Sequence, residues 1–141
     1  MAFWLLKSEP DCFGWAHHVA EGESLWDGVR NHQAANNLRA MAVGDQALFY
    51  HSGKDAAAVG ISVVSEAAFP DPTDPTGKWV AVRVRPVAPL PRAVPLKVMR
   101  TIAALADMAL LRQSRLSVVP VRAEEWDMIV AMGNKLAAVS Q

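Results

Sequence analysis

Hydrophobic residues along the chain occur in short runs and alternations that predict a mixed sheet with a few helices. The clearest alternation covers residues 78 to 85, where Val80, Val82 and Val84 share one face of a strand. The first predicted strand is an aromatic and leucine run that ends at the turn Ser8-Glu9-Pro10. The predicted strands cover residues 2 to 8, 46 to 51, 57 to 67, 78 to 85 and 118 to 121.

Periods of three and four residues predict helices between these strands. The predicted helical segments cover residues 12 to 19, 33 to 41, 96 to 112 (as one or two helices) and a final stretch that starts at Glu124-Glu125 and ends near Gly133. Residues 24 to 32 and 70 to 77 are predicted as loops, and residues 86 to 95 as a proline-rich bend. The pattern therefore indicates an α+β protein, a small sheet or barrel with peripheral helices.

The composition favours one domain over residues 1 to 141, because 52% of the 141 residues are hydrophobic and there is no linker or repeat. The single cysteine, Cys12, indicates a reducing, cytoplasmic setting and excludes a Cys-rich metal site held by this chain alone. No apolar run approaches the ~20 residues of a membrane span, and the start is unlike a signal peptide. We expect no cofactor, no metal and no membrane partner.

Charge is balanced overall but not along the chain. Fourteen basic and 14 acidic residues cancel, yet residues 78 to 122 hold nine basic residues against Asp107 alone. We therefore expect a basic face, with Arg83 and Arg85 as phosphate contacts. The alternative is that both arginines are solvated or paired with acidic residues of the first half, which would move a nucleic-acid path to Arg30, Arg39 and Lys54.

Tryptophan makes up half of the aromatic residues counted as Phe, Trp and Tyr, and its five copies have different settings. Trp4 and Trp126 lie in apolar context and are predicted to be core residues. Trp26 lies in a segment with no clean period, beside Asp27. Two interpretations remain open for its indole, which either packs under a loop or offers a stacking face to a ligand.

Polar side chains gather at the predicted end of the first strand. Lys7, Ser8 and Glu9 supply a cation, a hydroxyl and a carboxylate that suit the edge of a nucleobase, although a solvated turn would look the same. Arg30 and Asn31 add a guanidinium and an amide in the same part of the chain.

No pattern for catalysis stands out. His51 and Ser52 are neighbours at a strand end, so their side chains point to opposite faces and the histidine cannot easily activate the hydroxyl. The sequence also has no glycine-rich phosphate loop and no HExxH motif. We assign no catalytic residue and favour a binding module.

Six blocks of the sequence strongly resemble the EVE domain family: FWLLKSEP, LWDGVRN, NNLRAM, VGDQALFYHSGKD, LLRQSRLSVVPV and EEWDMI. The resemblance runs nearly from end to end. It implies a PUA-like fold, a small twisted β-barrel with peripheral helices, related to the PUA, ASCH and YTH domains. It also implies recognition of a modified base in DNA or RNA.

By the same resemblance, Lys7, Ser8 and Glu9 sit where YTH domains contact a base edge, and Trp26 sits at one wall of their aromatic cage. Further residues are implied to line or border the same pocket: Arg30, Asn31, Tyr50, His51 and Ser52. His32 and Ala35 depart from residues common among relatives. Glu9 replaces an amide found in YTH proteins.

The Glu9 carboxylate accepts hydrogen bonds but does not donate when ionised, which favours a base edge rich in N–H groups, such as a modified cytosine. The predicted function is thus a reader of a modified base that performs no chemistry. Two alternatives remain: a nuclease or RNA-processing enzyme of the ASCH kind that uses Lys7, Glu9 and His51, and a protein-interaction module that holds a peptide at Trp26.

Overall fold

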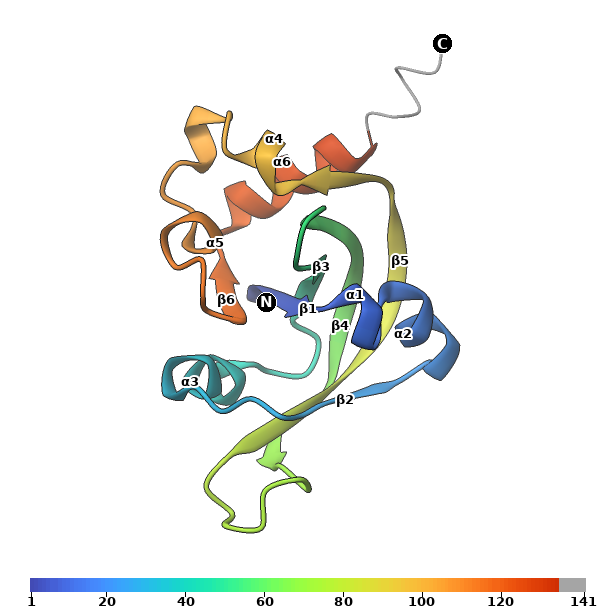
Figure 1. Cartoon of the computed structure of the whole chain (residues 1–141), viewed down its shortest axis with the longest axis vertical. Helices are drawn as coiled ribbons and strands as arrows, with labels where there is room; N and C mark the ends of the chain where they lie inside the picture. Colours follow the sequence, from blue (N-terminus) through green and yellow to red (C-terminus); the bar gives the residue numbers. More distant parts are fainter. Residues whose placement is uncertain (135–141) are drawn as a thin grey trace.

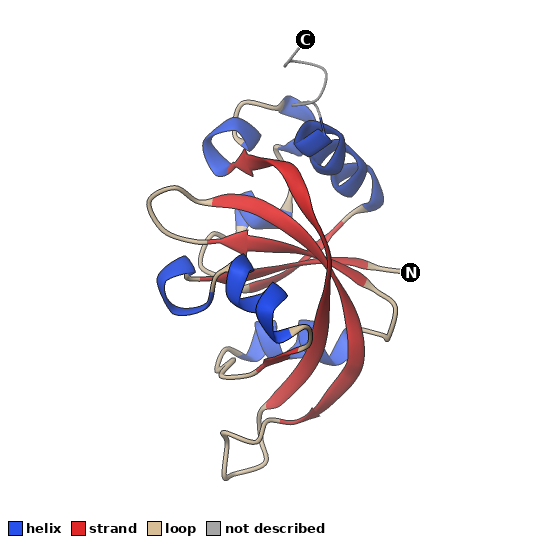
Figure 2. Ribbon diagram, turned by 90° about the vertical axis from the view of Figure 1, so that its right-hand side faces the viewer, coloured by secondary structure: helices blue, strands red, loops and turns tan. Residues whose placement is uncertain are grey.

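A mixed sheet of six strands forms the centre of the protein, which a computed structural model describes for residues 1–134 (Figure 1). The strands follow the order β2-β5-β4-β3-β1-β6. Their bounds are β1 (Phe3–Ser8), β2 (Ser24–Trp26), β3 (Gln46–His51), β4 (Ala57–Pro70), β5 (Val80–Pro95) and β6 (Val118–Val121). The sheet is strongly twisted, as Figure 2 shows, and its edge strands β2 and β6 are not paired with each other in the described residues. The α+β class is confirmed, with an open sheet in place of a closed barrel.

Short helices cover the sheet. They are α1 (Pro10–Phe13), α2 (Trp15–Glu21), α3 (His32–Ala40), α4 (Leu96–Met99), the 3-10 turn η1 (Ala103–Leu105), α5 (Ala109–Arg112) and α6 (Ala123–Asn134). Within residues 1–134, no helix has the length and apolar character needed to cross a membrane. The predicted domain runs on to Gln141, and residues 135–141 lie outside the described part.

Several predicted elements are confirmed and others are wrong in instructive ways. The first, second, third and last predicted strands match β1, β3, β4 and β6. Residues 24 to 26 form the edge strand β2, where we predicted a loop. The sequence could not indicate this strand, because three residues are too few to show an alternation. The helix predicted over residues 12 to 19 is divided at Gly14.

The prediction of a proline-rich bend over residues 86 to 95 is also wrong, because β5 continues through these residues to Pro95 while paired with β4. On the other side of β5, strand β2 pairs only with residues 82 to 84. Beyond that point the prolines lie on an edge with register shifts, where a missing N–H donor is tolerated.

The C-terminal half holds one further difference. Residues 96 to 112 form three short helical segments where we predicted one or two helices. The final helix agrees with the prediction, since α6 starts at Ala123 and its described part reaches Asn134, next to Gly133. A Cβ at Gly133 would lie only 3.1 Å from Leu90, so its lack of a side chain lets α6 pack closely on β5.

The core is built around β1, whose Trp4, Leu5 and Leu6 are buried. β1 pairs in parallel with β3 and antiparallel with β6, so both of its edges are occupied. The indole N–H of Trp4 donates to the buried carboxylate of Asp45 at 3.0 Å. Trp126 is buried as well and stacks on Phe3, so the core assignment of both tryptophans is confirmed.

His18 joins helix α2 to two strands through a chain of hydrogen bonds. Its ring is fully buried, with Nδ1 at 2.7 Å from Ser24 Oγ and Nε2 at 2.8 Å from Ser62 Oγ. The Ser24 hydroxyl donates to Glu21, so it accepts from Nδ1–H and leaves Nε2 to accept from Ser62. Burial lowers the pKa of His18, with Glu21 opposing the shift, so the neutral ring belongs to the folded state.

We predict that His18 makes folding stability depend on pH in the weakly acidic range. Because the folded pKa is lower than the unfolded value of about 6.5, this contribution is complete above that pH and is lost as the pH falls toward the folded pKa. The His18→Gln variant should be less stable at pH 8 by about 1–3 kcal/mol, because it disturbs buried hydrogen bonds. Its unfolding free energy, measured in urea, should also decline less than that of the wild type between pH 8 and pH 5. An equal decline of the unfolding free energy with pH in the variant and the wild type would contradict this role of His18.

Candidate functional site

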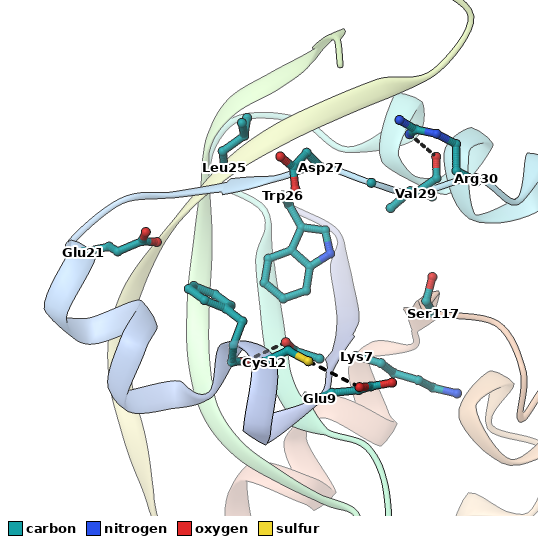
Figure 3. Close-up of a pocket in the computed structure, with 13 residues that line it drawn as sticks. Lys7, Glu9, Cys12, Glu21, Leu25, Trp26, Asp27, Val29, Arg30 and Ser117 are labelled. Atoms are coloured by element: carbon teal, nitrogen blue, oxygen red, sulfur yellow. Dashed lines mark hydrogen bonds between the residues drawn. The ribbon is translucent and has the colours of Figure 1, made fainter. Parts of the chain in front are cut away.

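A cavity of about 770 Å³ opens between the end of β1, helix α1 and the chain that follows β2 (Figure 3). This volume lies within the range of small-ligand pockets, roughly 300–1,000 Å³. The lining residues are Lys7, Ser8, Glu9, Cys12, Phe13, Glu21, Leu25, Trp26, Asp27, Gly28, Val29, Arg30 and Ser117. The cavity therefore collects residues from three separate parts of the sequence.

One wall of the cavity comes from the end of β1. Pro10 starts helix α1 directly after this strand, which holds the preceding residues at a fixed strand–helix junction. Lys7 Nζ donates to the carbonyl of Ser114 at 2.8 Å, and partial burial lowers the Lys7 pKa. Ser8 Oγ donates to the carbonyl of Phe13 at 2.6 Å. The oxygens of Glu9 and Ser8 thus reach the cavity from a rigid base.

The opposite wall is the indole of Trp26, which Figure 3 shows pointing toward helix α1. Only 8% of this residue is exposed, and its ring meets Phe13 and Phe49 edge to face, with centroids 6.1 and 5.6 Å apart. Trp26 is thus both a core residue and a cavity wall. The two open interpretations of its indole are therefore compatible, and removal of the indole would also remove core packing.

The third wall is the segment that contains Gly28 and Arg30, and a buried carboxylate from the loop between β4 and β5 holds it in place. Asp71 accepts hydrogen bonds from the N–H of Gly28 at 2.8 Å and from Nη1 of Arg30 at 3.0 Å. Gly28 has a φ of +75°, a conformation that glycine adopts without strain. Burial alone would raise the pKa of Asp71, but hydrogen bonds from Thr73, Gly28 and Arg30 outweigh it and hold the pKa well below its usual range.

The cavity is rich in acceptors. Three carboxylates line it, from Glu9, Glu21 and Asp27. The charge of Arg30 is balanced by Asp71. The thiol of Cys12 donates to Glu9 at 3.5 Å, and this hydrogen bond, with the nearby negative charge, raises the Cys12 pKa. The thiol is therefore kept protonated and is a poor nucleophile.

Four of the predicted ligand-binding residues do not line this cavity: Asn31, Tyr50, His51 and Ser52. Asn31 caps helix α3 by accepting from the N–H of Ala34. Tyr50 is buried beside Lys7, whose Nζ lies 6.0 Å from its ring centroid. His51 and Ser52 line a separate hollow of about 470 Å³ on the far side of Glu9.

His51 is engaged in the fold. Its Nε2 accepts a hydrogen bond from the N–H of Trp15 at 3.0 Å, and burial lowers its pKa. Ser52 Oγ donates to the carbonyl of Ser8 at 3.3 Å. These contacts tie β3 to the start of α2 and to β1.

Arg83 and Arg85 lie away from the cavity, each against a carboxylate. Arg83 pairs with Glu66 at 3.0 Å, and Arg85 pairs with Glu23 at 3.2 Å. This arrangement matches the paired alternative raised by the sequence. Their contact with phosphate stays a prediction.

Two further sequence features find a place in the structure. His32 and Ala35, which depart from the family pattern, do not line the cavity: His32 lies against Trp79, and Ala35 is fully buried in α3. Among residues 1–134, no group of three or more His, Cys, Asp or Glu side chains is arranged to hold a metal ion.

Sequence reasoning missed more than half of the residues that line the cavity, namely Cys12, Phe13, Glu21, Leu25, Gly28, Val29 and Ser117. Ser117 is more than 100 positions from Lys7 and reaches the cavity only because β6 pairs with β1. The glycine directly after Trp26-Asp27 was the one local signal, since glycine often marks a positive φ.

The twisted open sheet, with its surrounding helices and a cavity at one strand end, has the PUA-like fold that the resemblance implied. The family model described as "EVE domain" matches residues 2–132. The chain belongs to the EVE domain family. The resemblance expected from the sequence blocks is thereby confirmed.

Relatives of known name or structure agree with this assignment. Mouse thymocyte nuclear protein 1 is 35% identical in an alignment 164 positions long that covers 92% of this chain and 73% of that protein. The structure of Rpa0253 from Rhodopseudomonas palustris is 46% identical, with a TM-score of 0.91, covering 96% of this chain and 95% of that one.

The human THYN1 protein has been solved in complex with DNA that contains 5-methylcytosine. It is 31% identical, with a TM-score of 0.87, covering 96% of this chain and 99% of that one. A YTH domain from Zygosaccharomyces rouxii, solved with N6-methyladenosine RNA, shares the fold alone, at 19% identity and a TM-score of 0.58, covering 94% of this chain and 84% of that one.

We predict that Asp71→Asn loosens the cavity wall formed by Gly28 and Arg30. The amide cannot accept all the hydrogen bonds that the carboxylate accepts, so stability should fall by about 1–3 kcal/mol. Amide hydrogen exchange at Gly28 should become faster.

Asp74→Asn is the matched control. The Asp74 carboxylate organises the same loop through Thr76, Lys78 and Trp79, but it has no hydrogen bond to Gly28 or Arg30. Exchange at Gly28 should be unchanged in this variant. Equal acceleration in both variants would show that the loop as a whole, and not Asp71, holds the wall.

Proposed function

We propose that this protein is a reader of a modified nucleobase in DNA or RNA, with the base held between Trp26 and the end of β1. The observation that supports this most is the cavity itself, where an indole lies opposite a hydroxyl and a carboxylate. An aromatic face suits stacking on any base, and fixed donors and acceptors suit recognition of its edge. The complex of the related THYN1 protein with 5-methylcytosine DNA supports the same class of ligand.

A base inside a duplex cannot reach such a cavity, so the ligand must be flipped out or single-stranded. Burial of the base between Trp26 and β1 requires its removal from the stack of neighbouring bases. The energy needed is a few kcal/mol and is least where the base is already unpaired.

Among modified bases, we favour a modified cytosine. The cavity offers carboxylate oxygens from Glu9, Glu21 and Asp27, and these accept from the exocyclic amino group of cytosine. Apolar contacts for an added methyl group are available from Val29, Phe13 and the Trp26 ring.

The alternative of an ASCH-like enzyme has less support. Acid–base chemistry by Lys7, Glu9 and His51 requires them to face one substrate, yet His51 lines a different hollow and its Nε2 accepts from Trp15. Lys7 donates to the carbonyl of Ser114.

The function is tested by titrating the protein with oligonucleotides that each carry one modified base. The panel contains single-stranded and duplex DNA and RNA with 5-methylcytosine, N6-methyladenine or no modification. We expect saturable binding that prefers a modified cytosine. Absence of binding to every member would overturn the proposal, and cleavage of an oligonucleotide would favour the enzyme.

We predict that Trp26→Phe weakens binding of the preferred oligonucleotide, because the smaller ring gives less stacking area; loss of a stacked aromatic ring costs about 1–3 kcal/mol per base. Trp126→Phe is the matched control, since Trp126 is equally buried but lies outside the cavity. Both variants should melt at a lower temperature, and only the first should bind less tightly when affinity is measured well below its melting point. Equal affinities of the two variants would remove Trp26 from the site.

We predict that Glu9→Gln changes base preference more than total affinity. Glutamine offers a donor beside an acceptor, so the ratio of affinities for modified cytosine and modified adenine should shift toward adenine. Asp11→Asn is the control, because Asp11 lies in the short helix that starts directly after Glu9 but does not line the cavity. An equal loss for every oligonucleotide would contradict a reading role for Glu9.

A further inference from the structure

A second hollow of about 360 Å³ adjoins the cavity on the side of helix α3. It is lined by the start of α3 and by residues 112 to 116. The two depressions share a rim, because consecutive residues line one and then the other: Arg30 and Asn31 on one side, Leu116 and Ser117 on the other. The hydrogen bond from Lys7 Nζ to the Ser114 carbonyl closes the same rim at 2.8 Å.

The charge of the second hollow differs from that of its surroundings. None of the described residues that line it is acidic, and it contains the guanidinium groups of Arg112 and Arg115. Arg112 is paired with Asp107 at 2.7 Å. Arg115 is exposed and has no carboxylate within ion-pair distance among residues 1–134.

The hollow on the far side of Glu9 has the opposite character. Three carboxylates line it, from Glu9, Asp11 and Asp55, against the single lysine Lys54 and His51, whose pKa is lowered. A phosphate would be repelled there and attracted at Arg115. The two sides of the cavity are therefore not equivalent for a polyanion.

Amide groups complete the second hollow. Gln33 Nε2 donates to Gln113 Oε1 at 2.7 Å, and this bond leaves an acceptor on Gln33 and a donor on Gln113 without a partner in the described residues. Asn31 uses its oxygen to cap α3, which leaves its amide nitrogen as a donor. Such groups bind base edges and sugar hydroxyls as readily as water.

We propose that the nucleic-acid strand leaves the cavity across this second hollow, with Arg115 on the phosphate next to the bound base and the Gln33–Gln113 pair beside the neighbouring nucleotide. This inference rests on the proposed function and adds a direction to it. The proposal also assigns the phosphate contact to Arg115 in place of Arg83 and Arg85, because these two arginines are paired with carboxylates.

The test compares Arg115→Gln with Lys54→Gln. Each variant removes one exposed positive charge, from the second hollow for Arg115 and from the hollow that shares Glu9 with the cavity for Lys54. Affinity for single-stranded oligonucleotides with and without the modified base is measured at several salt concentrations. Arg115→Gln should weaken binding several-fold, equally for modified and unmodified strands, and flatten the log–log salt dependence by roughly 0.7. Lys54→Gln should leave that slope unchanged.

A second arm uses oligonucleotides cut short on one side of the modified base. Truncation on the side that crosses the second hollow should weaken binding by the wild type but change binding by Arg115→Gln little. Truncation on the other side of the modified base should weaken binding by both proteins alike. Equal salt slopes for the two variants, together with intact preference for the modified base, would overturn the strand path and leave the reader function standing. Lack of binding by the wild type would overturn the reader function itself.

Discussion

Strand β1 is held by hydrogen bonds on both edges, and the architecture of the site follows from this constraint. Its pairing with β3 is parallel, and a parallel pair requires the chain to cross over before the second strand begins. That crossover contains α1, α2, β2 and α3. It brings Trp26 and Arg30 back over the end of β1, where Lys7 and Ser8 emerge. The cavity is thus the space enclosed between a strand end and its own crossover.

The crossover is fixed by polar contacts with distant parts of the chain. The fully buried ring of His18 links α2 to β2 and β4, and Asp71 ties the segment after β2 to the loop between β4 and β5. Buried groups of this kind contribute little when satisfied but are costly when left without partners. The wall opposite β1 therefore has one well-defined position, although the segment after β2 is irregular.

Much of this arrangement could be predicted from local pattern. The strands containing Leu5 and Leu48 were evident from their hydrophobic runs, and the polar residues predicted to gather at the end of the first strand line one cavity. The prolines of residues 86 to 95 predicted a bend where β5 continues, because their tolerance depends on an unpaired strand edge that no local pattern reveals. The burial of Trp26 was equally hidden, since it depends on Phe13 and Phe49 from other elements. Pairing between distant segments decided each of these features.

The double position of Trp26, in the core and at the cavity surface, limits how this domain can diversify. A substitution of this indole changes the cavity wall and also removes packing against Phe49, so the cavity surface and the core cannot be adjusted separately there. The carboxylates of Glu9 and Asp27 carry no such restriction, because they line the cavity without belonging to the hydrophobic core. New specificities within this architecture are therefore expected to arise by exchange of these acidic side chains around an aromatic wall that stays constant.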